Sequence, residues 1–178
     1  MPETPALSIY ETTFTESNKT DAILVVQSKK LHVNKAILSY YSDYFNTLFN
    51  SDFKEKSMSE IEIKDVEFED FAVLLSMTQP NQILPTGIQN AEKLLELADR
   101  FLLPIAKHHL EIFLISTNLY QLGKIRIGEK YQLLELLENG IQQCDNAYYF
   151  KELPGNSTYK ELSDKTKVKL FYKMLTLI

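Results

Sequence analysis

The sequence contains one cysteine, five glycines and no tryptophan among its 178 residues. The single cysteine, Cys144, excludes an internal disulfide and fits a reducing compartment. The glycines lie too far apart to form the clustered loop with which P-loop and dinucleotide-binding proteins approach phosphates. No apolar run approaches the ~20 residues of a membrane-spanning helix, and the N-terminus lacks the basic and apolar regions of a secretory signal.

The charge balance is mildly acidic. The 24 Asp and Glu residues exceed the 19 Lys and Arg residues, so the net charge is −5. Proteins that bind nucleic acid or anionic membrane surfaces carry clustered positive charge, so we expect neither partner. A hydrophobic content of 44% is ordinary for a folded protein, and the length suits one domain, with or without a helical appendage. We expect an intracellular protein that is cytoplasmic, nuclear or both.

The residues that usually carry chemistry do not form a site in the sequence. His108 and His109 are neighbours, and neighbours on a helix point about 100° apart, so they cannot ligate one metal ion together. We expect His109 at the edge of a core and His108 in solvent, while His32 stands alone. No cationic residue adjoins Cys144 to activate it, which predicts a buried structural thiol. We therefore expect no metal, no cofactor and no enzymatic activity.

Three segments have the pattern of strands. Residues 21–26 form a continuous apolar run after an aspartate, which is typical of a strand covered on both faces. A polar turn over 27–30 and an alternating stretch over 31–33 complete a predicted hairpin. The alternation over 60–64 predicts a third strand with one solvated face. Ahead of them, residues 7–14 alternate weakly, as an edge strand or the tail of an upstream element would.

Helical periodicity fills most of the remaining sequence. Asn34 and Ser42 are N-cap candidates, and Phe45, Leu48 and Phe49 recur at helical spacing, which predicts core positions. Further helices are predicted from Phe68, from an N-cap at Asn90, from Pro104 in a first turn, and over 125–141. A small three-stranded sheet flanked by helices and followed by more helices is an α+β fold.

The last 36 residues are less regular. Pro154-Gly155 and several polar residues predict a loop or a small irregular element over 143–163. A final amphipathic helix is expected from Asp164 to Ile178. Its apolar positions are expected to dock onto the preceding helices rather than onto a partner; they are Val168, Phe171, Met174 and Leu175.

Several motifs occur together in the order and spacing of a known family. They are Asp21-Ala-Ile-Leu-Val-Val26, Leu31-His-Val-Asn-Lys35, Ser42-Asp-Tyr-Phe45, Leu48-Phe49, Glu60-Ile-Glu-Ile63, Phe68-Glu-Asp-Phe71 and Ala91-Glu-Lys-Leu-Leu-Glu-Leu-Ala-Asp-Arg-Phe101. With these motifs the sequence resembles a BTB/POZ domain, in particular those of nematode BTB and MATH–BTB proteins. The resemblance implies the BTB/POZ fold over 20–117, a partly irregular segment over 1–19, and a helical, BACK-like extension over 118–178.

The resemblance also implies a dimer pocket. Asp21 and Lys35 stand at the positions of the charged pair that the family places there. A buried pair of opposite charges is costly to break and so favours one fixed partner geometry. A solvent-exposed salt bridge of little energetic value is the other interpretation of the same two residues.

A cullin-binding surface is the second implication. Many BTB domains recruit a cullin-3 scaffold through a hydrophobic-x-Glu motif in the loop after the helical hairpin, and Phe53-Lys54-Glu55 fits that motif. An aromatic anchor beside a carboxylate suits an interface, because the ring fills a pocket and the charge fixes the register. Alternatively, Phe53 folds back onto the hairpin and Glu55 is solvated. In cullin-binding relatives the region from Tyr120 to Leu137 adds a second contact surface.

Three features depart from the family pattern. Position 34 is Asn where the family usually has His, and Met77-Thr-Gln-Pro80 replaces the usual Tyr-Thr-Gly. No clear helix precedes Asp21, although such a helix normally builds much of the homodimer interface, so dimerisation is left open.

Taken as this resemblance implies, the chain is a non-catalytic substrate adaptor that joins a cullin-3-type scaffold to an unknown substrate protein. A MATH or Kelch domain usually holds the substrate; here it lies outside these residues, or 118–178 or another chain takes its place. The alternative is a scaffold that forms homodimers or pairs with other BTB proteins and binds no cullin.

Overall fold

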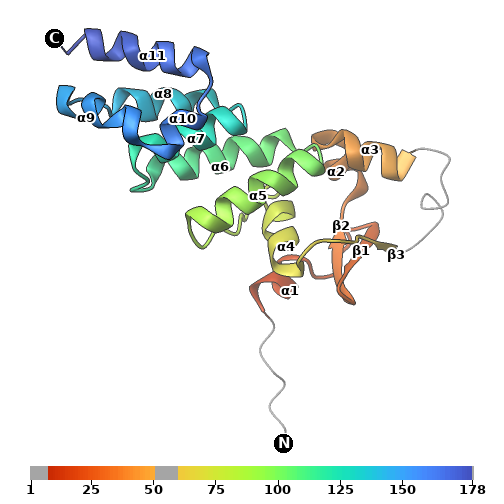
Figure 1. Cartoon of the computed structure of the whole chain (residues 1–178). Coiled ribbons are helices and arrows are strands. Elements are labelled where there is room, and N and C mark those ends of the chain that lie inside the picture. The colour runs from red at the N-terminus through yellow and green to blue at the C-terminus, as the bar shows by residue number, and fades with distance from the viewer. Residues whose placement is uncertain (1–7, 51–59, 178) are drawn as a thin grey trace, which may run out of the picture. The chain divides into compact units, whose positions relative to one another are not determined.

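The computed structural model describes residues 8–50 and 60–177 of the chain (Figure 1). By its internal contacts the chain divides into two compact units, Met1–Lys107 and His108–Ile178. The first unit contains the sheet and the helices around it. The described part of the second unit is helical.

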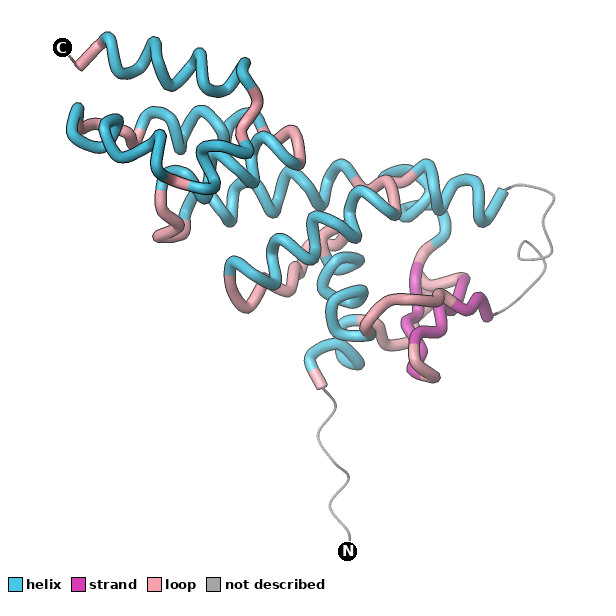
Figure 2. Tube along the Cα trace, in the orientation of Figure 1, coloured by secondary structure: helices cyan, strands magenta, loops and turns pink. Residues whose placement is uncertain are grey.

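A three-stranded sheet lies in the first unit and is coloured magenta in Figure 2. Its strands are β1 (Ala22–Val26), β2 (Lys29–Val33) and β3 (Glu60–Glu62), in the order β2-β1-β3. β1 pairs with β2 in antiparallel and with β3 in parallel orientation. Gln27 and Ser28 join β1 to β2 with φ angles of 49° and 63°, the left-handed geometry of a two-residue hairpin turn. The predicted hairpin and third strand are confirmed.

Helices surround this sheet. They are α1 (Ile9–Thr13), α2 (Lys35–Tyr41), α3 (Asp43–Asn50), α4 (Phe68–Ser76) and α5 (Ile88–Arg100), and α6 (Pro104–Ser116) runs across the division between the units. The predicted α+β fold is therefore confirmed.

Two predicted N-caps are present. The Asn34 side chain accepts a hydrogen bond from the Ile37 amide (2.9 Å) at the start of α2. Ser42 Oγ accepts from the Phe45 amide (3.1 Å) at the start of α3, and its hydroxyl donates to a main-chain carbonyl, that of Phe101 (2.6 Å). Ser42 thus starts one helix and fastens it to the end of another, because a hydroxyl can accept and donate at once.

Two sequence predictions about helix starts are wrong. The alternating stretch 7–14 contains α1 rather than an edge strand, because Ser8 and Glu11 form a reciprocal capping box that favours a helix. A short helix therefore does precede Asp21. Asn90 is not an N-cap, because α5 already begins at Ile88 and the Asn90 side chain reaches back to the Thr86 amide (3.2 Å).

Aromatic side chains fill the core of the first unit. Phe45 and Phe49 are buried, as predicted, and their rings stack at a centroid distance of 5.8 Å. Phe45 also stacks on Phe101 (5.9 Å) and lies 6.5 Å from Phe71. One ring of α3 therefore joins α4 to the residue that ends α5.

The second unit is built from short helices. They are α7 (Gln121–Lys130), α8 (Leu134–Gln142), α9 (Ala147–Glu152), the 3-10 turn η2 (Leu153–Gly155), α10 (Ser157–Glu161) and α11 (Asp164–Leu175). The stretch 143–163, expected to be a loop or irregular, is thus largely helical, because Asn146 and Asn156 cap α9 and α10 with their side chains.

Glycines allow α7 and α8 to pack closely. A Cβ atom on Gly128 would lie 2.7 Å from the Leu137 backbone nitrogen, and one on Gly140 would lie 2.8 Å from Cγ1 of Ile125. Neither position therefore accepts a larger residue without a shift of its neighbour, which explains glycine within two helices where it lowers helix propensity.

Charged side chains of one helix complete the ends of others in the second unit. Glu111 of α6 is buried and accepts a hydrogen bond from the Leu136 amide (3.0 Å) in the first turn of α8. Lys124 of α7 is 1% exposed, and its ammonium donates to the Ile115 carbonyl (2.9 Å) at the end of α6 and to Asn139 Oδ1 (3.0 Å) of α8. These contacts satisfy helix-end groups that have no partner within their own helix.

Glu129 of α7 does the same for α11. Its carboxylate accepts hydrogen bonds from the amide (3.1 Å) and hydroxyl (2.6 Å) of Ser163 and from the hydroxyl of Thr166. Burial alone would raise the pKa of Glu129, but these hydrogen bonds outweigh it and lower the pKa below its ordinary value. We call the contacts of Glu111, Lys124 and Glu129 the cross-helix caps.

The prediction for the apolar residues of α11 is partly wrong. Met174 packs against the core of the second unit, but Val168, Phe171 and Leu175 are about half exposed, at 51%, 54% and 50%. The buried apolar residue of the helix is Leu170, which is 1% exposed. The four predicted positions span about a third of the helix circumference, so they could share one face. The helix instead turns the adjoining side, which carries Leu170 and Met174, toward the core.

Neighbouring residues of α11 therefore give a direct test of its orientation. Leu170→Ala is expected to lower the free energy of unfolding of the second unit by about 2–5 kcal/mol, because it empties a buried site. Phe171→Ala removes a larger but half-exposed side chain and should cost about 1 kcal/mol or less. Urea denaturation of both variants checks this, and a larger loss for Phe171→Ala would mean that the helix is rotated.

Candidate interaction site

The two predicted cullin contacts of the hairpin loop, Phe53 and Glu55, lie outside the described residues. In sequence they follow α3 and precede β3. The third, Tyr120, immediately precedes α7 in the second unit and is 56% exposed. Its carbonyl accepts from the Lys124 amide (3.1 Å), so the backbone is fixed while the ring remains available to a partner.

The structure brings Asp21 and Lys35 together, but the Asp21 carboxylate contacts the main-chain amide of Lys35. Asp21 Oδ1 accepts a hydrogen bond from the Lys35 amide (2.7 Å), and the Lys35 ammonium lies 5.7 Å from the ring centroid of Phe49. The Asp21 amide also donates to the Val33 carbonyl (3.0 Å). Asp21 therefore ties the start of β1 to the start of α2, and a role for the pair in a dimer pocket stays a prediction.

Apolar side chains on α1 and α2 face solvent. Ile9 is 60% exposed, Ile37 is 44% exposed and Tyr40 is 82% exposed. The Tyr40 ring packs edge-to-face on Tyr41 at 5.0 Å. Large apolar residues exposed on a folded unit are typical of surfaces that bind another protein.

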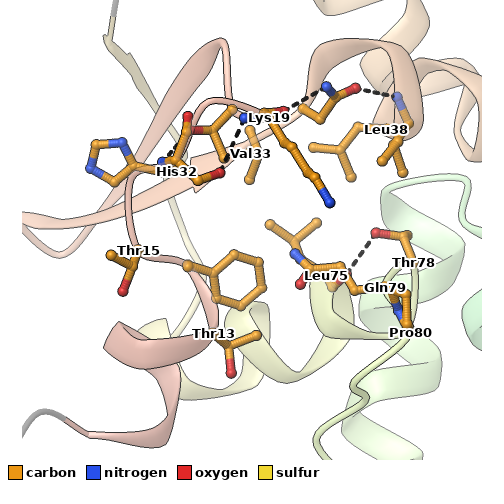
Figure 3. A pocket seen from close by; sticks show the side chains of 15 residues that line it. Thr13, Thr15, Lys19, His32, Val33, Leu38, Leu75, Thr78, Gln79 and Pro80 are labelled. Carbon is orange, nitrogen blue, oxygen red and sulfur yellow. Dashed lines mark hydrogen bonds between the residues drawn. The ribbon is translucent and has the colours of Figure 1, made fainter.

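A pocket of about 220 Å³ opens in the first unit (Figure 3). Its walls come from the end of α1 and the segment that follows it (13–20), from β2, from the first half of α2, and from the end of α4 with the residues 78–80 after it. Sequence periodicity could not reveal it, because four separate segments form it. One signal was present, however: Asn34 and part of Met77–Pro80, two of the three departures from the family pattern, line it.

The histidines and the cysteine occupy the predicted environments. His108 is exposed and His109 is half-buried, where burial and then the neighbouring His108 lower the pKa of His109. Cys144 is 1% exposed, its thiol contacts the Gly140 carbonyl (3.4 Å), and burial raises its pKa to about 11. The thiol is therefore protonated and inert at neutral pH.

Within residues 8–50 and 60–177, no three His, Cys, Asp or Glu side chains come together to hold a metal ion. No helix in the same residues has the length and apolar character needed to cross a membrane.

Comparison with known proteins gives consistent results. The family model described as the BTB/POZ domain matches residues 10–118. A BTB/POZ domain-containing protein of Caenorhabditis elegans, Y57A10B.3, is 36% identical over 163 residues, which are 89% of this chain and 50% of that protein. BTB and MATH domain-containing protein 38 of the same nematode is 32% identical over 92% of this chain and 42% of its own length. The chain thus spans half or less of these relatives.

Among solved structures, the BTB domain of human gigaxonin is similar to this chain. The match has a TM-score of 0.45 and 20% sequence identity, and it covers 64% of this chain and 99% of the gigaxonin chain.

Proposed function

Since this chain belongs to the BTB/POZ domain family of protein-interaction modules, we propose that it acts as a substrate adaptor that binds a cullin-3-type scaffold in a ubiquitin ligase. The observation that supports the proposal is the match over residues 10–118, which includes Phe53-Lys54-Glu55, three residues beyond the end of α3 in sequence. The adaptor acts by holding a substrate protein beside the ligase, which raises the effective concentration of substrate lysines there. It needs no catalytic residue of its own.

In this proposal the domain covers 20–117, after the segment 1–19, and the BACK-like extension 118–178 provides a second cullin contact at Tyr120. Tyrosine is enriched among residues that dominate binding energy, and this ring is 56% exposed. The adaptor would work in the cytoplasm, the nucleus or both. Its substrate is a protein not yet identified.

Calorimetric titration with the N-terminal half of cullin-3 from a matching organism tests the adaptor function. We expect micromolar or tighter binding, weakened at least 100-fold by Phe53→Ala combined with Glu55→Ala, because two hot-spot truncations of about 2 kcal/mol or more each act together. The matched control is Phe171→Ala with Glu161→Ala, which removes an exposed phenylalanine and an exposed glutamate elsewhere.

The possible outcomes test the adaptor function and the Phe53/Glu55 contact separately. Binding that survives in the Phe53/Glu55 variant, with circular dichroism showing intact folding in all samples, keeps the adaptor function and moves the contact. Absence of binding by the unmodified chain overturns the adaptor function.

The exposed apolar residues of α1 and α2 favour a second candidate, an oligomerisation scaffold. Ile37 and Tyr40 would be covered by a second copy or by another BTB protein. Light scattering on the same samples distinguishes the two: a scaffold forms dimers whether or not Phe53 and Glu55 are replaced, and it does not bind cullin.

A further inference from the structure

The pocket of Figure 3 has an apolar floor. Phe14, Val33, Leu38 and Leu75 line it and are each no more than 3% exposed. Ile37, which is 44% exposed, stands at its wall. Its volume of about 220 Å³ is below the roughly 300–1,000 Å³ of sites that hold drug-sized molecules. The pocket therefore suits one large apolar side chain better than a whole small-molecule ligand.

Most polar side chains around this floor already form hydrogen bonds within the protein. The hydroxyls of four lining threonines donate to main-chain carbonyls at 2.7–2.8 Å; they are Thr13, Thr15, Thr20 and Thr78. Asn34 is used twice, because its amide nitrogen donates to the Lys19 carbonyl (2.7 Å) while its oxygen caps α2. These groups shape the pocket, and their main bonding capacity is directed away from a ligand.

Three lining side chains keep polar groups with which a ligand could form hydrogen bonds. Within the described part of the chain, no side-chain hydrogen bond or ion pair is found for Lys19, His32 or Gln79. In Figure 3 the Lys19 side chain extends into the space between His32 and Val33 of β2 and Thr78 and Gln79 after α4. An ammonium presents three donors, and a primary amide presents two donors and one acceptor.

The charge of the lining has one sign. Lys19 contributes a positive charge, and no carboxylate is among the described residues that line the pocket. An anionic group placed near Lys19 would therefore meet an ammonium and the Gln79 amide without repulsion from the walls. The pocket is complementary to a group that is apolar at its tip and negatively charged beside it.

We propose that this pocket binds a peptide segment of a partner protein, inserting one large apolar side chain and placing the carboxylate of an adjacent Asp or Glu against Lys19. A free organic acid of this size would have few further contacts, whereas a peptide also contacts the rim through its backbone. This inference goes beyond the adaptor proposal, because it assigns a partner class to residues outside the predicted cullin contacts. It rests on the adaptor proposal only where that partner is called a substrate.

Fluorescence polarisation with labelled peptides tests the proposal on the full chain. The panel consists of acetylated, amidated hexapeptides in which Leu, Ile, Met, Val or Phe adjoins Asp, in either order, between glycines and serines. Each has two controls, with Asp replaced by Asn and with the apolar residue replaced by Ala. We expect at least one Asp peptide to bind at sub-millimolar Kd, and both of its controls to bind at least about fivefold more weakly.

Lys19→Gln should weaken the best Asp peptide about fivefold and leave its Asn counterpart unchanged, because the carboxylate is the partner of the ammonium. Lys151→Gln, an exposed lysine of the second unit, is the matched control and should change neither. Amide NMR shifts caused by the peptide should centre on Lys19, His32 and Thr78–Gln79.

Three results would overturn the proposal. The first is a panel with no sub-millimolar binder, or shifts that centre elsewhere. The second is binding that appears only after removal of residues 1–7, which would make the chain's own N-terminal segment the occupant. The third is tight binding of a free acid such as 4-methylpentanoate. A chain that binds a panel peptide but not cullin-3 keeps this proposal and loses the adaptor function.

Discussion

Phe45→Ala is expected to lower the free energy of unfolding of the first unit by about 3–5 kcal/mol, the range for removing a fully buried phenylalanine. The Phe45 ring is 0% exposed and contacts four other rings, those of Tyr44, Phe49, Phe71 and Phe101. Truncation removes these aromatic contacts as well as apolar burial. The space cannot close easily, because its walls belong to three helix segments that are also fixed by other contacts.

Urea denaturation followed by fluorescence and far-ultraviolet circular dichroism measures this loss. Leu84→Ala is the control in the same unit: Leu84 is 67% exposed, so its removal should change stability by about 0.5 kcal/mol or less. Equal losses for the two variants would contradict the assignment of the aromatic core to Phe45.

Lys124 is the second position where a large effect is expected. Lys124→Ala should destabilise the second unit by about 2–5 kcal/mol, as other truncations of long buried side chains do. Lys124→Met keeps the volume of the side chain but leaves the Ile115 carbonyl and Asn139 Oδ1 without their donor. It should therefore lower the free energy of unfolding by about 1–3 kcal/mol. Lys124→Met should cost less than Lys124→Ala because methionine fills the buried space that alanine leaves empty. Removing the charge from the interior offsets part of the lost hydrogen bonding.

The pH dependence gives this prediction a second readout. Burial lowers the pKa of Lys124 below its ordinary value of 10.5, so in the window between the two pKa values the unfolded chain binds more protons than the folded chain. The stability contributed by Lys124 therefore rises with pH across that window. A neutral amine still has two hydrogens for its two acceptors. The difference in unfolding free energy between the unmodified chain and Lys124→Met should be larger at pH 10 than at pH 7.

Hydrogen exchange of peptides from α7 and α8, measured at both pH values, assigns the effect to the second unit. The groups that titrate in both proteins cancel in the difference. If the difference in unfolding free energy between the unmodified chain and Lys124→Met is smaller at pH 10 than at pH 7, Lys124 is stabilised as a cation in the folded state, contrary to its burial.

Local chemistry made part of this fold predictable. The caps at Asn34 and Ser42 depend on contacts within three residues, and the hairpin depends on alternation and a short turn. The prediction that failed in α11 depends on packing between distant parts of the chain, which local sequence does not determine. A stripe of apolar residues says that a helix is amphipathic but not which side meets the core, so Phe171 was expected inside and Leu170 is there instead.

The candidate sites were predictable only in part. The family motifs gave Asp21 and Lys35, and the structure adds that a backbone amide joins them. The pocket around Lys19 could not be predicted, because which threonine hydroxyls are used and which donors stay available depends on folded geometry. The only trace of it in the sequence was the departure from the family pattern at Asn34 and Met77–Pro80.

The cross-helix caps of Glu111, Lys124 and Glu129 bear on how the second unit opens. Each cap satisfies the end of a helix other than its own, so unfolding of α7 would expose the last turn of α6 and the first turn of α11 at once. Fraying of a single helix would thus leave buried polar groups of its neighbours without partners. The helices of this unit should behave as one foldon, with amide protons of α7, α8 and α11 exchanging together instead of in order of their distance from the chain end.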